Sequence, residues 1–198
     1  QCQRILEGWE VHICPNVMPK FGVLQIEPTQ KQIREIFLGR IIQAKGLSQA
    51  QSLLSDILMP TPSAVLLAME LLAKGCEGES GIGDLIGVDV GGATTDVYSM
   101  ADGMPEQMNT VYKGLPEPYA KRTVEGDIGM RYSVGGIVEA AGLQRVSALS
   151  GIAPARVEEL VAYLRANTDC LPNGDRELEA LDQALASLAV ETAVARHA

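Results

Sequence analysis

The fold follows from residues 85–97, which read Leu85-Ile86-Gly87-Val88-Asp89-Val90-Gly91-Gly92-Ala93-Thr94-Thr95-Asp96-Val97. An apolar run contains an aspartate near its end. Two glycines follow it, and after them come residues that favour strands. Such runs, separated by Gly-Gly, predict two antiparallel strands joined by a tight turn. We expect strands over 85–90 and 94–100. The Asp102-Gly103 turn then lets a third strand return over 106–112, which makes a β-meander.

The turn carries residue types that suit a bound phosphate group. Glycine lets backbone N–H groups approach phosphate oxygens, because no Cβ intervenes. Thr94 and Thr95 alternate across the strand, so we expect only one hydroxyl to reach a ligand. Asp89, at the strand end, can hold waters of a Mg²⁺ ion, whereas Asp96 is expected to brace the turn. The alternative is an exposed hairpin in which Gly-Gly serves only the turn.

Asp89 is the candidate catalytic and metal-binding residue, and the candidate cofactor-binding residues are Gly91, Gly92, Thr94, Thr95 and Asp96.

Periodicity predicts the elements on either side of the hairpin. Short strands are expected over 9–14 and 23–26, and a polar loop with a domain boundary over 77–83. The proline-containing residues 114–122 predict irregular structure. Helices are expected from Pro28 to Gly46, from Thr61 to Lys74 as a buried helix, from an Asp127 cap through Val138, over 154–164 and over 175–197.

Composition excludes several classes of partner. The 198 residues are 46% hydrophobic and 21% charged, which permits a folded core, and the net charge of −9 repels nucleic acid. No apolar run is long enough to span a membrane, so we expect no membrane partner and a cytoplasmic protein. The four cysteines are scattered and predict reduced thiols rather than a metal cluster or a disulfide framework.

Two further groups of charged residues have alternative interpretations. Glu125 and Asp127 could activate a water as a carboxylate pair, although helix capping by Asp127 is favoured. A locally basic region could contact phosphate or a partner's carboxylate, or it could be solvated surface charge; it consists of Lys113, Lys121, Arg122 and Arg131.

The hairpin motif D-x-G-G-x-T-x-D resembles the second phosphate motif of the actin-like ATPase superfamily, with Ala93 in place of a common third glycine. A resemblance to one particular family extends over nearly the whole chain. It is strongest in the stretch GLPEPYAKRTVEGDIGMRY at residues 114–132. This stretch is similar to the glutamate mutase-associated MutL family. It implies an α/β protein with an incomplete ribonuclease H-like, actin-like ATPase fold, containing the β-meander and a largely helical C-terminal part.

The resemblance also implies an arrangement of lobes. Residues 1–80 would be the C-terminal part of the first ATPase lobe, and residues 84–198 most of the second, with a helical subdomain at about 143–198. Neither a first phosphate hairpin nor an adenosine-contacting Gly-Gly turn is recognisable. The chain is therefore expected to be a central fragment that carries one wall of a nucleotide site and hydrolyses ATP negligibly by itself.

The function implied is that of an ATP- and Mg²⁺-binding accessory protein, an assembly or reactivation ATPase. Its expected partners are the subunits of an adenosylcobalamin-dependent mutase such as glutamate mutase. Two alternatives remain open: a hydantoinase/oxoprolinase-type ATP-dependent hydrolase, which carries a similar hairpin, and an actin-like scaffold that is switched by nucleotide.

Overall fold

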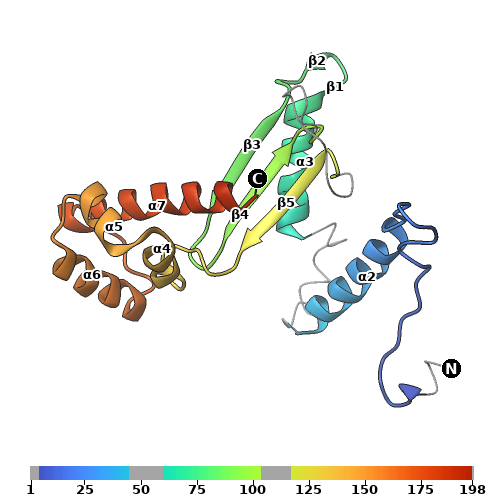
Figure 1. Cartoon of the computed structure of the whole chain (residues 1–198), viewed down its shortest axis with the longest axis horizontal. Coiled ribbons are helices and arrows are strands. Elements are labelled where there is room, and N and C mark those ends of the chain that lie inside the picture. Colours follow the sequence, from blue (N-terminus) through green and yellow to red (C-terminus); the bar gives the residue numbers. More distant parts are fainter. Residues whose placement is uncertain (1–4, 45–59, 104–116, 198) are drawn as a thin grey trace, which may run out of the picture. The chain divides into compact units, whose positions relative to one another are not determined.

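A computed structural model describes residues 5–44, 60–103 and 117–197 (Figure 1). Contacts divide the chain into two units. The first covers residues 1–64, and the second covers nearly all of residues 65–198. Each unit is described by itself.

The first unit contains one long helix, α2, over Glu27–Ala44. It begins where Glu27-Pro28 predicts, and the N–H groups of Thr29 and Gln30 donate to the carbonyl of Ile26. The expected strands over 9–14 and 23–26 are wrong. In the described residues of this unit, the β pairing is a single isolated bridge between Lys20 and Val23. Alternation alone does not make a strand when no neighbouring segment pairs with it.

The second unit is built on a three-stranded antiparallel sheet in the order β3-β4-β5. Strand β3 covers Leu85–Val90, β4 covers Thr95–Met100 and β5 covers Ala120–Glu125. The predicted hairpin is therefore confirmed, with Val90 paired to Thr95 across the turn.

The third strand of the described sheet is β5, whereas the sequence predicts a third strand over 106–112. Residues 106–112 lie outside the described residues, and the free edge of β4 pairs with β5, from Thr95↔Glu125 to Met100↔Ala120. Residues 120–122 belong to β5, although the prolines before them predict irregular structure throughout 114–122. The proline effect ends at Pro118, because Tyr119 and its successors retain their N–H donors.

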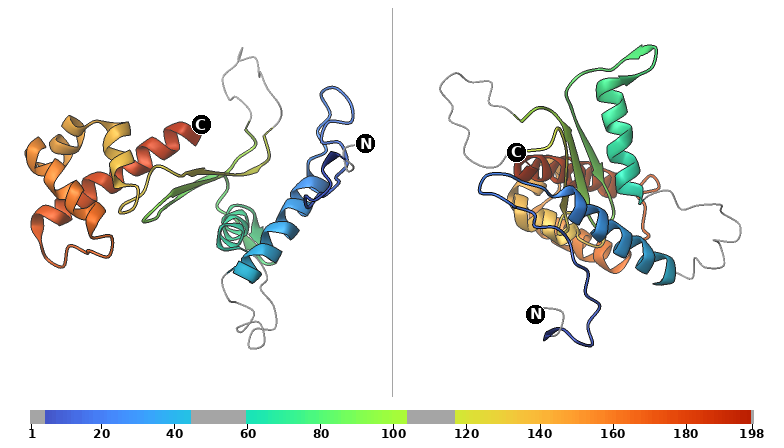
Figure 2. Two further views of the ribbon diagram at one scale, coloured as in Figure 1. Left: turned by 90° about the horizontal axis from the view of Figure 1, so that it is seen from below. Right: turned by 90° about the vertical axis from the view of Figure 1, so that its right-hand side faces the viewer.

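Helices cover both faces of the sheet. The left view of Figure 2 shows α3 (Thr61–Lys74) and the C-terminal end of α7 (Arg176–His197) on opposite sides of the strands. Tyr98 and Met100 point towards α3, where they pack with Ala73. The opposite face receives α7, whose last residue, His197, hydrogen bonds to Ser99.

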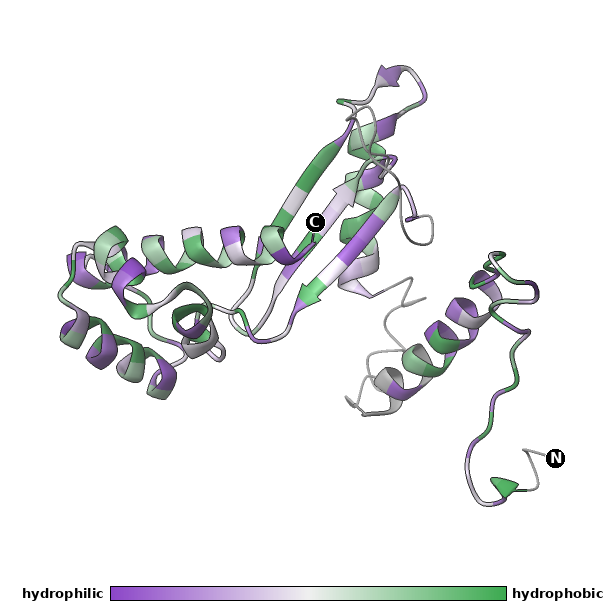
Figure 3. Ribbon diagram, viewed as in Figure 1, coloured by the Kyte–Doolittle hydropathy of each residue, from purple (hydrophilic) through white to green (hydrophobic). Residues whose placement is uncertain are grey.

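Helix α3 covers Thr61–Lys74, with the predicted bounds, but it is not a buried helix. Its sheet-facing side packs on the strands through Val65, Leu66, Met69 and Ala73. Leu67, Leu71 and Leu72 are 46%, 60% and 50% exposed. Figure 3 shows this mostly apolar helix beside the apolar strand β3. The apolar composition of α3 predicts that all sides of the helix are buried. In the structure the sheet covers only one side of it.

A small hairpin follows α3, made of β1 (Gly75–Cys76) and β2 (Glu79–Ser80), so the expected loop over 77–83 contains a short strand. The remaining helices are α4 (Val134–Ala141), α5 (Leu143–Ser150) and α6 (Pro154–Ala166), which pack with α7 around the main apolar core. The predicted helices over 154–164 and 175–197 are confirmed as α6 and α7.

Two aspartates near helix starts have different roles. Asp175 Oδ1 accepts from the N–H groups of Glu177 and Leu178 at 3.0 and 3.2 Å, and so caps α7. The sequence predicts that Asp127 caps a helix. This prediction is wrong, because α4 begins only at Val134. The Asp127 carboxylate instead accepts from Arg196 Nη1 at 3.0 Å.

The described residues thus form a mixed α/β structure with two small antiparallel sheets and six helices. Among these helices, none is long and apolar enough to cross a membrane. The assignment to two ATPase lobes stays a prediction.

Candidate functional site

The turn between β3 and β4 is a four-residue loop closed by a hydrogen bond from Gly91 N to Thr94 O at 2.9 Å. Gly91, Gly92 and Ala93 all avoid positive φ. The alanine in place of a third glycine therefore causes no backbone strain. A Cβ on Gly91 would lie 2.9 Å from Thr94 O, so Gly91 is required by close approach rather than by φ.

Residues 129–132, which we call the clamp segment, hold this turn from outside. Met130 N donates to Gly91 O at 3.0 Å, and the N–H groups of Arg131 and Tyr132 donate to Gly92 O at 2.8 and 2.9 Å. The approach is close because a Cβ on Gly129 would lie 2.3 Å from the carbonyl carbon of Ala93. The carbonyls of both turn glycines are therefore fixed by the clamp segment.

Three N–H groups of the turn differ from these carbonyls and from Gly91 N, which donates to Thr94 O. Within the described part of the chain, no backbone carbonyl accepts from Gly92 N, Ala93 N or Thr94 N. Successive unpaired N–H groups in a turn form a partial positive charge that suits an anion.

The two aspartates of the motif lie directly opposite each other, since Asp89 pairs with Asp96 in the strand register. Like charges at opposite positions destabilise a sheet unless a cation compensates them. Arg122 Nε donates to Asp96 Oδ1 at 2.8 Å and supplies that compensation. The Asp89 carboxylate is exposed, and no cation pairs with it in the described residues.

Tyr98 lies below these carboxylates on the same face, and burial, followed by the negative charge of Asp96, raises the pKa of its hydroxyl. The phenol therefore stays neutral at physiological pH. Of the two opposed aspartates, Asp89 is the one that no cation of the described residues pairs with.

The two threonines have different surroundings. Thr95 is fully buried, and its hydroxyl donates to Ile128 O at 3.0 Å. Thr94 is half-buried and precedes β4. The hydroxyl of Thr95 is thus committed to the protein interior, which leaves Thr94 for a ligand.

The expected basic region is neutralised by carboxylates where the structure describes it; Lys113 lies outside the described residues. Lys121 Nζ donates to Glu117 Oε2 at 2.8 Å, and Arg122 pairs with Asp96. The third cation, Arg131, pairs with Asp182. These three cations therefore form ion pairs within the protein.

The expected carboxylate pair is also bound by the protein. Glu125 Oε2 and Asp127 Oδ1 accept from Arg196 Nη1 at 2.7 and 3.0 Å. This shared cation holds the last turn of α7 against the end of β5.

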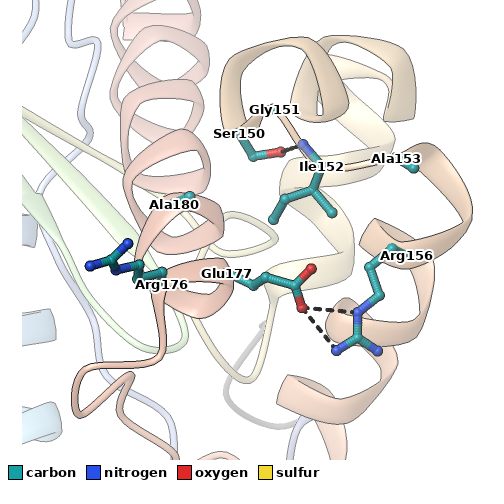
Figure 4. A pocket seen from close by; sticks show the side chains of 8 residues that line it. All are labelled: Ser150, Gly151, Ile152, Ala153, Arg156, Arg176, Glu177 and Ala180. Atoms are coloured by element: carbon teal, nitrogen blue, oxygen red, sulfur yellow. Dashed lines mark hydrogen bonds and ion pairs between the residues drawn. The ribbon is translucent and has the colours of Figure 1, made fainter.

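A pocket of about 340 Å³ lies in the helical part, far along the chain from the hairpin; it is lined by Ser150, Gly151, Ile152, Ala153, Arg156, Arg176, Glu177 and Ala180 (Figure 4). Arg156 Nε and Nη2 donate to Glu177 Oε2 at 3.2 and 3.0 Å, so the guanidinium is already paired. No residue of the D-x-G-G-x-T-x-D motif lines this pocket.

Sequence reasoning missed the clamp segment. The signal available was Gly129, a glycine inside a stretch expected to be helical, since such a residue often marks a close approach of two backbones. Its partner, Ala93, could not be inferred because it is distant in the sequence.

Comparison with known proteins adds a family relationship. A family model described as MutL protein matches residues 1–198. The chain is also similar to Protein MutL of Clostridium tetanomorphum, with 46% identity over 185 residues. The match covers 93% of this chain and 40% of the relative, so the chain spans less than half of the relative's length. No solved structure matches.

Proposed function

Because the chain belongs to the MutL protein family, we propose that its β3–β4 hairpin is a phosphate-binding wall of an ATP site in a mutase-associated accessory protein. The observation that carries the proposal is the set of N–H groups at Gly92, Ala93 and Thr94, which lack backbone acceptors in the described residues. Glycine at 91 and 92 keeps the backbone accessible to phosphate oxygens.

The carboxylate of Asp89 fits a Mg²⁺ ion that accompanies a nucleotide. Mg²⁺ keeps several of its waters and takes one or two carboxylates, so a single exposed aspartate is sufficient. Asp96 is less suitable, because Arg122 already neutralises it. In this assignment Asp89 holds water molecules of the ion, while the turn N–H groups and Thr94 hold phosphate oxygens.

Bound Mg²⁺ would supply charge neutralisation between phosphate oxygens. The protein's own part is positional. The clamp segment fixes the turn carbonyls, Arg122 fixes Asp96, and Thr95 fixes the start of β4 through Ile128. Preorganised donors of this kind stabilise developing charge without rearranging during the reaction.

At the level of the whole protein, the proposed role is assembly or reactivation of an adenosylcobalamin-dependent mutase such as glutamate mutase, with ATP as the energy source. Family membership supports this role over a hydantoinase/oxoprolinase-type hydrolase. An actin-like scaffold would use the same hairpin, but it predicts nucleotide-dependent polymerisation.

The test is Mg-ATP binding by calorimetry, and Mg-dependent hydrolysis, in the full-length protein. Asp89→Asn removes the free charge but leaves the strand pairing, so hydrolysis should fall by about two orders of magnitude or more with an unchanged melting temperature. Asp84→Asn is the matched control, since Asp84 is an exposed aspartate just before β3. Wild-type hydrolysis in Asp89→Asn would refute the metal-site assignment. The absence of Mg-ATP binding by the unmodified protein would refute the site itself.

A further inference from the structure

We propose that Arg131 is a positioning residue for the β3–β4 hairpin, which it ties to the helical part of the second unit. The inference rests on the proposed function only where it concerns nucleotide affinity. Its structural content, that Arg131 fixes the clamp segment and thereby the turn, stands on the contacts below.

The backbone of Arg131 belongs to the clamp segment. Its N–H donates to Gly92 O at 2.8 Å, in the turn that is proposed to bind phosphate. The carbonyl at the other side of that same peptide unit, Met130 O, accepts from the Arg131 guanidinium at 2.8 Å. Both polar groups of one peptide are thus held, which sets the direction in which its N–H points.

The guanidinium is itself fixed by two other elements. It pairs with the Asp182 carboxylate on α7 in bidentate fashion, at 3.0 and 2.7 Å. Its Nε donates to Cys170 O, in the α6–α7 connection, at 3.0 Å. The Arg131 side chain is 11% exposed and that of Asp182 is 19% exposed. A planar guanidinium with this many bonds has little rotational freedom.

The sheet and the helices are connected at this point by a continuous set of bonds. It leads from the Gly92 carbonyl through the Met130–Arg131 peptide to Asp182 and Cys170. A shift of α7 or of the α6–α7 connection therefore changes the turn directly, without passing through the apolar core. The helical part can in this way affect the turn N–H groups, and bound phosphate can affect the helices to the same extent, because coupling between sites is reciprocal.

The experiment uses nucleotide-free full-length protein, in which amide hydrogen exchange is followed residue by residue by NMR. The variants are Arg131→Met and Asp182→Asn, the second of which keeps a side chain of the same shape and one acceptor oxygen. We expect exchange at the backbone amides of positions 130, 131 and 132 to become about tenfold faster in both variants. Amides of α6 should keep their rates.

Arg145→Met is the matched control, because Arg145 pairs with Glu191 on α7 through exposed side chains. It should leave the clamp amides unchanged. Unchanged exchange at the clamp segment in Asp182→Asn would overturn the inference, because the ion pair would then have no effect on these amides. Equal acceleration in α6 would also overturn it, because the ion pair would then stabilise the protein only in general. Asp182→Glu, which restores the charge, should recover most of the protection.

Mg-ATP calorimetry on the same proteins separates the two proposals. If the turn binds phosphate, affinity should fall by about tenfold or more in Asp182→Asn, because misplaced donors lose much of their effect. Faster clamp exchange in a protein whose unmodified form binds no nucleotide would refute the proposed function and leave the positioning role of Arg131 intact. If the unmodified protein binds nucleotide, an affinity that is unchanged despite faster exchange would overturn the part of the inference that links Arg131 to nucleotide binding.

Discussion

Gly91 and Gly92 are neighbours in the same turn, but they are required for different reasons. Gly91 has no room for a side chain, since its added Cβ would lie 2.9 Å from Thr94 O. Gly92 has room in the protein, with the Tyr132 ring 3.8 Å from an added Cβ. The turn itself therefore requires only the first glycine, and the second is free to serve a ligand.

This difference predicts opposite outcomes for two substitutions. Gly91→Ala should lower the free energy of unfolding by about 1–3 kcal/mol, because the turn must shift to admit the Cβ. Gly92→Ala should change it by less than about 0.5 kcal/mol, yet weaken Mg-ATP binding, because a Cβ keeps phosphate away from the backbone. Urea unfolding and calorimetry measure the two effects. Unchanged nucleotide affinity in Gly92→Ala would contradict the proposed approach of phosphate to the turn.

The residues of the hairpin could be predicted because they are local in sequence. Asp89 lies near the end of an apolar strand and Gly91-Gly92 follows at once. The partners that decide which groups remain free are distant. Arg122 lies 26 positions from Asp96, and Ile128 lies 33 positions from Thr95. A single sequence contains no signal for these pairings, so the division between free and committed side chains needed the structure.

At the scale of elements, α7 is docked on the sheet by a polar contact as well as by its apolar stripe. The ring nitrogens of His197 lie 2.7 Å from Thr123 Oγ1 and 2.7 Å from Ser99 Oγ. Lys121 Nζ donates to the backbone carbonyl of His197 at 2.9 Å. Burial, followed by the charge of Lys121, lowers the pKa of His197 below its ordinary value of 6.5, against the weaker opposing charge of Glu117.

The direction of that pKa shift predicts the pH dependence of stability. The unfolded chain takes up the proton more readily than the folded one, so the contribution of His197 is complete above about pH 6.5 and declines as the pH falls below it. Urea midpoints measured from about pH 8 to about pH 5 should therefore decrease more steeply in the unmodified protein than in His197→Gln. Equal slopes in both proteins would show that the ring is not held in its neutral form.

Helices with strong periodicity were the most predictable elements. The leucines of α7 recur on one side, and Leu181, Leu185 and Leu188 are buried. The predicted secondary structure was wrong where a local sequence pattern competed with an interaction with residues distant in the sequence. Asp127 has the chemistry of a cap, but Arg196 takes its carboxylate. Residues 120–122 follow two prolines, but pairing with β4 makes them a strand.

At the scale of the whole chain, the buried apolar residues of the described part are unevenly distributed. They lie between Ala73 and Ala193, all within the second unit. In the first unit Trp9 is 78% exposed and Phe21 is 102% exposed. Because hydrophobic burial is the main favourable contribution to folding, the second unit should supply nearly all of the free energy of unfolding.

A chain shortened to residues 60–198 retains α3 and every element after it. Its urea midpoint and the steepness of its transition should match those of residues 1–198, because the surface exposed on cooperative unfolding is the same. Its circular dichroism should lose the signal of the 18-residue helix α2.

A core substitution provides the control for that comparison. Leu185 is fully buried, and Leu185→Ala should cost about 2–5 kcal/mol in both the long and the short chain. Equal costs would show that one core governs both transitions. A shortened chain with a clearly lower midpoint would mean instead that residues 1–59 stabilise the second unit, and that its stability cannot be attributed to its own core alone.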